Sequence, residues 1–455
     1  MTAKNDIKAK FLSGSIPKHV TTMTLSGAVG LVGVFFVDLL DLYFLSLLGE
    51  AELAAAVGYA GTLTYITLAV GIGLSIATGI VIARLLGAGE SDLAKVKFAS
   101  SLTLSLLVAL VIVVGLIPNL GVILTQLGAQ GLTHKYAMQY LTIVIPALPF
   151  LVLAMGCSAA LRGLGAGKSA MFITLGGALV NGVLDPILIF GLEMGVEGAA
   201  LASAISRFCM LMIGIYFLHS RYRFFIKVPL KELFCHMQEI IKLAVPAIVT
   251  NQAAPFANAY IVASIAKFGD SAVAGFSIIG RIQPVAFGLV FALSGALGPI
   301  VGQNFGGKSY DRIKRSVYFS YLFITCYVIA ICLFMMAILP WLIDIFNASD
   351  EAAELLALFV NLVALSFVFN GMVFVGNAVF NNLGKPFYSS ILNWSKATLG
   401  TIPFVYIGSD LMQAKGVLMG QAAGNLVFGL ISFVAVILFM RRKFGALKSG
   451  VETSK

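Results

Sequence analysis

The chain has very few charged residues. Only 11% of its 455 residues are Asp, Glu, Lys or Arg, while 59% are hydrophobic and the mean hydropathy is +0.98. Repeated apolar stretches exceed the roughly 20 residues that cross a bilayer, which excludes a soluble globular protein. The first stretch, near residues 21–48, is far longer than the roughly 7 to 15 residue core of a signal peptide. The sequence therefore predicts a polytopic membrane protein that keeps its first span.

Cysteine motifs and nucleotide-binding motifs are missing as well. The five cysteines show no metal-like pairing. The turn from Gly163 to Ser169 resembles a phosphate-binding loop, but it has three residues rather than four between its outer glycines, and it joins two apolar spans. We therefore expect no enzyme activity and no cofactor, and we expect the energy for any transport to come from an ion gradient.

The apolar stretches divide into twelve predicted spans, which together predict an all-α membrane protein. Some of them are interrupted by glycine or proline, so their limits are loose by several residues. The spans lie near residues 20–48, 56–86, 97–126, 134–161, 169–192, 195–219, 238–267, 272–305, 315–346, 352–381, 387–409 and 414–441.

Positively charged residues are unevenly spread along the chain. With the N-terminus placed in the cytoplasm, 24 of the 30 Lys and Arg residues fall in inner segments and three in outer loops. The other three, Arg207, Arg281 and Lys396, lie inside spans. The positive-inside rule then predicts a multi-pass membrane protein with both termini in the cytoplasm. The net charge of +10 follows from this spread, which favours lipid headgroups over nucleic acid as partners.

The chain repeats itself once. Residues 49–51 match residues 269–271 with an offset of 220, and Asp185-Pro186 matches Ile402-Pro403 with an offset of 217. We therefore predict two six-helix lobes related by a pseudo-two-fold axis along the membrane normal, with a cavity between them. The predicted parts are an N-terminal lobe, a cytoplasmic linker, a C-terminal lobe and a cytoplasmic tail, at residues 1–219, 220–237, 238–441 and 442–455.

Three carboxylates fall deep inside apolar spans of the first lobe, namely Asp38, Asp41 and Asp185. A charged group at the bilayer centre costs about 2.5 to 3.5 kcal/mol even on lenient insertion scales. Three such groups need a functional reason, and the simplest one is binding of a coupling cation.

The matching positions of the second lobe are not acidic. They hold Ile261 and Ile402, and neutral Asn258 stands opposite Asp38. Because the same fold accepts isoleucine there, a purely structural role for two of the three acids is disfavoured.

Local spacing indicates a shared site in the first lobe. Asn181 lies four residues before Asp185, one helical turn away on the same face. Pro186 lacks an amide hydrogen, so it should free the carbonyl of Gly182 and bend the helix beside the acid. Carboxylate, amide and carbonyl oxygens suit Na⁺, and buried carboxylates suit H⁺ equally well. The residues leave the choice between Na⁺ and H⁺ open.

Several motifs resemble those of the multidrug and toxic compound extrusion (MATE) family. They are the stretch around Asp41, the turn at 159–165, and the segments 181–186 and 195–200. The resemblance covers nearly the whole chain, and the prokaryotic DNA-damage-inducible branch fits best because the acids lie in the first lobe. This resemblance implies a protein of a prokaryotic plasma membrane. For that branch, the resemblance implies a cation site, for H⁺ or Na⁺, formed here by Asp41, Asn181, Asp185 and Ser203.

Three positions depart from the family pattern. Relatives commonly have a proline where Ser26 stands, whereas the second lobe keeps Pro246 at the matching position, so bending of the first span at a proline is not implied here. Asp38 replaces a usual asparagine and adds a carboxylate to the cation site. Another branch has a glutamate where Gln283 stands, so we expect no cation site in the second lobe.

The function implied by the resemblance is cation-coupled antiport. Such a protein exports amphipathic and often cationic compounds by alternating access, and it needs no partner beyond the lipid bilayer and the small organic substrate. We expect it to function as a monomer. The alternative is a lipid-linked-precursor flippase of the same superfamily, which should have a larger and more cationic cavity. The candidates for lining the substrate cavity are Asn258, Arg281, Gln283 and Lys396.

Overall fold

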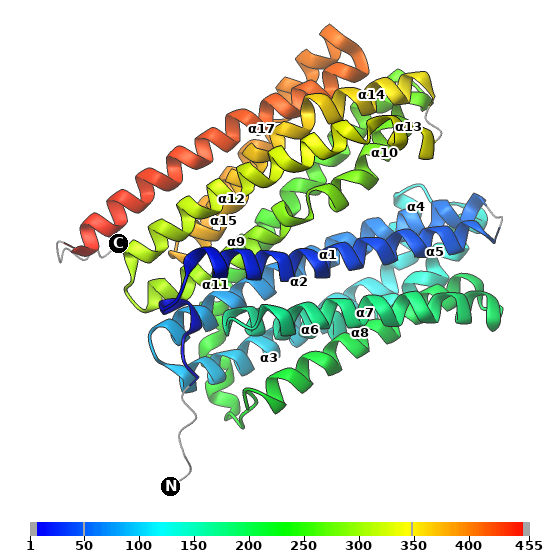
Figure 1. Ribbon diagram of the computed structural model, residues 1–455. Coiled ribbons are helices and arrows are strands. Elements are labelled where there is room, and N and C mark those ends of the chain that lie inside the picture. The colour runs from blue at the N-terminus through cyan, green and yellow to red at the C-terminus, as the bar shows by residue number, and fades with distance from the viewer. Residues whose placement is uncertain (1–6, 49–50, 347–348, 449–455) are drawn as a thin grey trace. The chain divides into compact units, whose positions relative to one another are not determined.

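The computed structural model describes residues 7–48, 51–346 and 349–448, and within them every regular element is a helix (Figure 1). The prediction of an all-α fold is therefore confirmed. The helices in chain order are α1 (Ile16–Ser46), α2 (Ala51–Gly87), α3 (Ser91–Leu116), α4 (Leu120–Gln126), α5 (Gly131–Val144), α6 (Leu148–Gly163), α7 (Gly167–Pro186), α8 (Gly195–Ser220), α9 (Leu230–Ile265), α10 (Asp270–Ala286), α11 (Gly288–Gly306), α12 (Tyr310–Ala337), α13 (Leu339–Ile345), α14 (Asp350–Asn361), α15 (Phe367–Asn382), α16 (Pro386–Thr398) and α17 (Ile402–Lys448).

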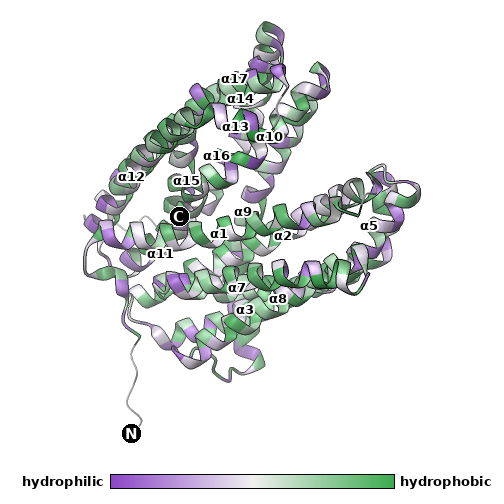
Figure 2. Cartoon of the chain, turned by 45° about the vertical axis from the view of Figure 1, so that its right-hand side comes forward, coloured by the Kyte–Doolittle hydropathy of each residue, from purple (hydrophilic) through white to green (hydrophobic). Residues whose placement is uncertain are grey.

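Hydrophobic residues run along most of the length of these helices (Figure 2). In the described residues, ten helical stretches are long and apolar enough to cross a membrane, and α5 with α6 forms an eleventh span that is bent by 52°. The stretch Pro386–Gly445 counts once in this total, although α17 breaks at Met412 and Gln413. Divided at that break, the stretch supplies two spans, and the predicted number of twelve is reached.

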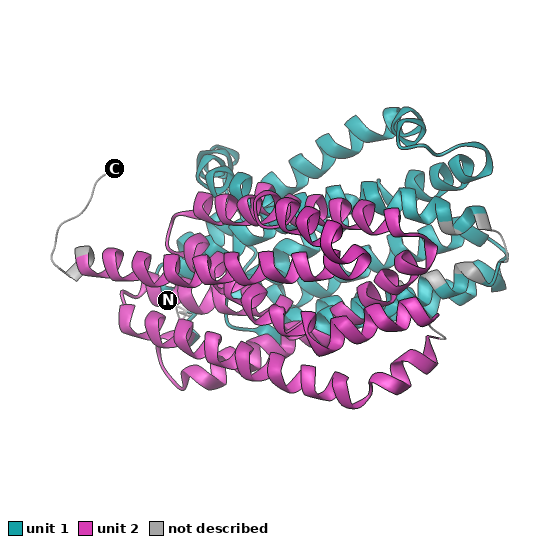
Figure 3. Ribbon diagram, turned by 90° about the horizontal axis from the view of Figure 1, so that it is seen from above, with its two compact units in different colours: residues 1–10, 29–248 teal, residues 11–28, 249–455 magenta. Residues whose placement is uncertain are grey.

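Contacts among the helices divide the protein into two compact units (Figure 3). Unit 1 holds residues 1–10 and 29–248, and unit 2 holds residues 11–28 and 249–455. The chain therefore passes between the units three times, first after Lys10, then inside α1 and then inside α9. The crossings inside α1 and α9 lie 220 residues apart, which is the offset of the sequence repeat.

The first half of α9 belongs to unit 1 because it packs there. Lys97 Nζ on α3 lies 2.6 Å from Glu239 Oε2 on α9, and Ile240 packs with Leu74 of α2 in one apolar cluster. The helix begins at Leu230, inside the predicted linker 220–237, because a proline directly precedes it and the acidic Glu232 lies in its first turn. The contact division thus lies beyond the predicted linker, and the lobe limits of 1–219 and 238–441 stay a prediction.

Residues 11–28 belong to unit 2 because their beginning is anchored there by hydrogen bonds. The buried Phe11 donates its backbone N–H to Gln303 Oε1 at 2.8 Å. Its carbonyl accepts from Asn304 Nδ2 at 3.2 Å and from an Arg312 guanidinium N–H at 3.0 Å. Phe11 then joins the large apolar core of unit 2, which fixes the start of α1 on that unit.

Candidate cation-coupling site

The second half of α1 packs closely on α7 because glycines of α1 face larger side chains of α7. A Cβ added at Gly30 would lie 2.4 Å from Thr174 Oγ1, and one added at Gly33 would lie 2.6 Å from Leu175 Cδ2. Two turns further along α7, a Cβ at Gly182 would lie 3.7 Å from Val37 Cγ2. The two helices therefore stay in contact up to the level of Asp41 on α1 and Asp185 on α7.

The two carboxyl groups lie side by side within unit 1. Asp185 is fully buried, and its Oδ2 accepts a hydrogen bond from Asn181 Nδ2 at 3.0 Å. Asp41 is close enough for its carboxyl group to interact with that of Asp185. The other oxygen, Asp185 Oδ1, is buried and accepts no hydrogen bond within the described part of the chain. Two adjacent carboxylates repel each other unless a proton or a cation lies between them, so this pair is suited to hold one.

Residues of α5 and α8 complete the surroundings of this pair. The hydroxyls of Tyr140 on α5 and Ser203 on α8 are hydrogen-bonded, and both aspartates lie near enough to act electrostatically on Tyr140. Arg207 lies beside Tyr140 and donates to the carbonyl of Val144 at 2.8 Å. In the described residues, Asp185 has no ion-pair partner. The site therefore presents oxygen ligands without a neutralising salt bridge to Asp185.

The regular α-helix ends beside Asp185. Pro186 has no N–H to donate, and a π-helical turn, Ile187–Gly191, follows it directly. Leu192 N–H donates to the carbonyl of Ile187 at 2.9 Å, five residues back. The sequence predicted a free Gly182 carbonyl and a bend beside this proline, and the structure shows a change of helical hydrogen bonding directly after it.

The predicted site residues Asp41, Asn181, Asp185 and Ser203 all lie in this region of unit 1, on α1, α7 and α8. The backbone of Asp38 lies in α1, but its side chain is outside the described residues. The sequence reasoning missed Tyr140 because nothing around it on α5 marks it as functional. It also missed Ser206, which donates to the carbonyl of Ser203 at 2.9 Å.

The cavity candidates in unit 2 are more scattered. Asn258 on α9 and Arg281 on α10 are exposed, and Gln283 is half-buried. Lys396 on α16 donates from Nζ to Asn370 Oδ1 on α15 at 2.6 Å. In the described part of the protein, no hydrogen bond or ion pair joins these four candidates to one another.

Neutral side chains take the place of acids in unit 2. Ile261 is buried in the apolar core. Between α15 and α16, Asn393 Nδ2 donates to Asn377 Oδ1 at 2.7 Å, and Ser389 Oγ donates to Asn381 Oδ1 at 2.9 Å. The two units thus differ in the charge of their polar interiors as the sequence repeat predicts.

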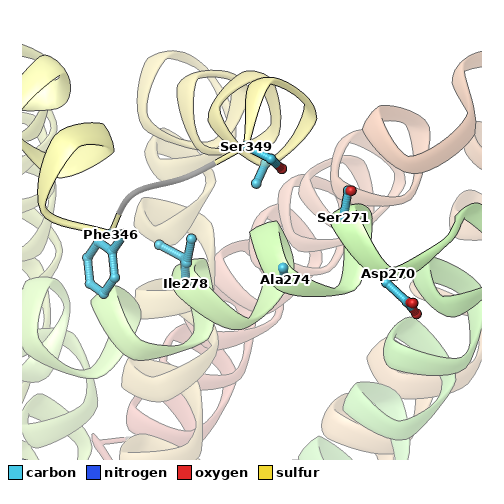
Figure 4. A pocket seen from close by; sticks show the side chains of 7 residues that line it. Asp270, Ser271, Ala274, Ile278, Phe346 and Ser349 are labelled. Atoms are coloured by element: carbon cyan, nitrogen blue, oxygen red, sulfur yellow. The ribbon is translucent and has the colours of Figure 1, made fainter.

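An open cavity of about 350 Å³ lies elsewhere in unit 2, at the start of α10 (Figure 4). Asp270 and Ser271 are at its rim, and Ile278 and Phe346 provide apolar wall. None of the predicted site residues lines this cavity, so it is separate from the candidate cation site.

Two long stretches of the sequence match the same family model. These are residues 28–187 and 246–407, and the model is described as MatE. The chain belongs to the MatE family. The matches begin 218 residues apart and end 220 residues apart, so the duplication seen in the sequence is a duplication of the MatE domain itself.

Curated MatE relatives match over nearly their full length. The chain is 28% identical over 431 residues to a protein of Shewanella oneidensis named "FAD transporter", covering 93% of this chain and 94% of that one. It is 24% identical over 445 residues to "Multidrug export protein MepA" of Staphylococcus aureus, covering 95% and 96%. As a MatE protein the chain is a multi-pass membrane transporter and not an enzyme.

The fold is that of solved MATE transporters. A crystal structure of a mutant of the Vibrio cholerae MATE transporter VcmN aligns with a TM-score of 0.89 at 21% sequence identity. The alignment covers 94% of this chain and 97% of that one. The predicted MATE architecture of twelve helices in two lobes is therefore confirmed.

Proposed function

We propose that this MatE protein is a cation-coupled antiporter that exports organic compounds by alternating access, with its coupling site at Asp41, Asn181, Asp185 and Ser203. The observation that supports this most directly is the carboxyl pair formed by the half-buried Asp41 and the fully buried Asp185. Burying charge at mid-membrane is costly, and the isoleucines at the matching positions of unit 2 make a structural need for these acids a poor explanation.

Coupling arises because the cation and the cargo act on the same equilibrium between two states of the transporter. A cation, either H⁺ or Na⁺, that binds the carboxyl pair more tightly in one state of the transporter shifts the protein toward that state. Export requires the cargo to favour the opposite state, because a ligand with equal affinity for both states shifts nothing. Asn181 and Ser203 supply neutral oxygens for the cation, and the Tyr140 hydroxyl holds Ser203 in place.

The proposed cargo is an amphipathic organic compound, often a cation, since one relative is named a multidrug export protein. The other relative is named for FAD, so the charge of the cargo varies among similar proteins. We further assign the chain to the DNA-damage-inducible branch, because its acids lie in the first half. Both termini are placed in the cytoplasm from the distribution of Lys and Arg, and the monomer is the proposed working form.

Efflux of ethidium from cells expressing the chain tests this proposal. Asp41→Asn should reduce gradient-driven efflux at least tenfold, and varying Na⁺ and pH separately should identify the ion. Asp410→Asn is the matched control, because Asp410 is an exposed acid of unit 2. Unchanged efflux by Asp41→Asn would remove the coupling proposal. Failure to export any cationic dye would instead favour the lipid-linked-precursor flippase.

A further inference from the structure

Unit 2 holds a lysine in the middle of the membrane. Lys396 lies ten residues after Pro386, the start of α16, which corresponds to about 15 Å along the helix. That is half of a hydrocarbon core roughly 30 Å thick. Its Nζ donates to Asn370 Oδ1 at 2.6 Å, and Asn370 lies twelve residues from the end of α15 at Asn382. The ammonium therefore points to the neighbouring helix and does not reach the cytoplasmic surface.

No acid offsets this charge. In the described residues the ion pairs are Lys95–Asp92, Lys97–Glu239 and Lys415–Glu354, and none includes Lys396. The lysine lies in the last turn of α16, where the helix dipole stabilises a cation. This stabilisation is well below the cost of placing a lysine at the bilayer centre. The helix dipole and the hydrogen bond to Asn370 together leave most of the cost of placing this charge in the membrane uncompensated.

The fold does not require the lysine. With the offset of 217 that matches Asp185 with Ile402, Lys396 matches Leu179 in unit 1. Leu179 is exposed and apolar, so the same helical position accepts a hydrocarbon side chain. A role in packing is therefore a poor reason to keep a cation there.

The backbone is broken beside Lys396. α16 ends at Thr398 and α17 begins at Ile402, and Thr401 Oγ1 donates to the carbonyl of Lys396 at 3.0 Å. Irregular backbone at membrane depth is tolerated only where protein buries it or where it lines a polar cavity, and transporters commonly form substrate sites at such breaks. In unit 1 the positions that match this break lie within α7, and the nearest irregular backbone is the π-turn that follows Pro186 beside the carboxyl pair.

Amide groups extend the polar face that carries the lysine. Asn393 lies three residues before Lys396, so the two share one side of α16. Asn393 contacts Asn377, and Lys396 contacts Asn370, so amides of both helices surround this side. The N–H groups of Asn393 are already bonded to Asn377 Oδ1 and to the Ser389 carbonyl, so the donor in this polar surrounding that suits phosphate or carboxylate oxygens is the Lys396 ammonium.

From these observations we infer that Lys396 is a recognition site for the anionic group, a phosphate or a carboxylate, of an organic cargo. The inference rests on the proposed export function and narrows its substrate class. Unit 1 takes the coupling cation on its acids, and unit 2 takes the anionic end of the cargo on its lysine. A cargo that carries both an aromatic body and a phosphate fits this description.

Equilibrium binding to the purified full chain in lipid nanodiscs tests the inference. Riboflavin and riboflavin 5′-phosphate differ only in the phosphate and are both fluorescent, so they are matched probes. We expect the wild-type protein to bind the phosphorylated flavin at least tenfold more tightly. Lys396→Met should remove that preference and change riboflavin binding less than twofold. Lys385→Met, at the exposed start of the same helix, should leave both affinities unchanged.

Two further variants distinguish loss of the lysine charge from misfolding of the protein. Lys396→Arg should retain most of the preference because it keeps the charge, and Asn370→Asp should abolish it by pairing with the lysine at the 2.6 Å contact. The inference is overturned if the wild-type protein does not distinguish the two flavins, or if Lys396→Met weakens both equally. Because binding is measured without an ion gradient, a failure of the antiport proposal would appear in ethidium efflux and leave this result intact.

Discussion

Units 1 and 2 are copies of one MatE domain with opposite charge inside. In unit 1, Asp41 and Asp185 lie together on α1 and α7. In unit 2, Ile261 and Ile402 stand at the matching positions, and Lys396 is the charge on the equivalent stretch of helix. The apolar packing was kept through the duplication while the interior charges diverged. We therefore propose that charge at membrane depth distinguishes the roles of the two copies, whereas the repeated apolar pattern stabilises both.

The breaks in the helices show the same contrast. Both copies interrupt a helix at the Asp185-Pro186 and Ile402-Pro403 level, but unit 1 continues through a π-turn whereas unit 2 separates α16 from α17. The broken backbone is thus the shared feature, and the charged side chain beside it is the variable one.

The largest expected effect comes from neutralising an acid of unit 1, which reduces the charge difference between the two units. Asp185→Asn should lower gradient-driven efflux at least tenfold, because it removes a carboxylate while keeping an oxygen that Asn181 can reach. If the two acids bind one cation together, adding Asp41→Asn should cause little further loss. Efflux rates of both single variants and the double variant check this. Losses that multiply would show that the two acids act at separate steps.

Packing of α1 on α7 should matter next. Gly30→Ala would place a Cβ 2.4 Å from Thr174 Oγ1, so the helices must separate and Asp41 would shift from Asp185. Overpacking of this kind costs about 1–3 kcal/mol, which should appear as a lower melting temperature together with weaker ion affinity. Gly115→Ala is the matched control, because a Cβ there meets nothing within 4 Å. Equal behaviour of the two variants would argue against close helix contact as the means of placing Asp41.

Much of this arrangement could be predicted from the sequence. The length of the apolar stretches predicted the spans, and the isoleucines of the second lobe singled out Asp41 and Asp185 as candidate functional acids. Residue spacing placed Asn181 beside Asp185, since four residues make one helical turn. Ser203 came only from the family resemblance.

Other features depend on packing between distant segments and could not be predicted. Tyr140 has no local signal, and it reaches Ser203 only because α5 packs on α8. The crossing of α1 and α9 between units follows from long-range contacts such as Phe11 with Gln303 and Lys97 with Glu239. The break inside α17 lies between the spans predicted at 387–409 and 414–441, but the φ of 52° at Gln413 could not be predicted, because no glycine or proline stands there.

The smallest expected effect comes from removing neutral hydroxyl groups beside the acids of unit 1. Tyr140→Phe and Ser203→Ala each remove one hydroxyl from a hydrogen-bonded pair beside the carboxyl groups. A net hydrogen bond contributes about 0.5–1.5 kcal/mol, so each change should weaken the apparent ion affinity about two- to tenfold. Because the hydroxyls are partners, the double variant should lose no more than the weaker-binding single variant. Thr142→Ala, an exposed hydroxyl bonded to its own helix, should have no effect on ion affinity. Losses that add in the double variant would mean that Tyr140 contributes to the site directly, rather than by holding Ser203.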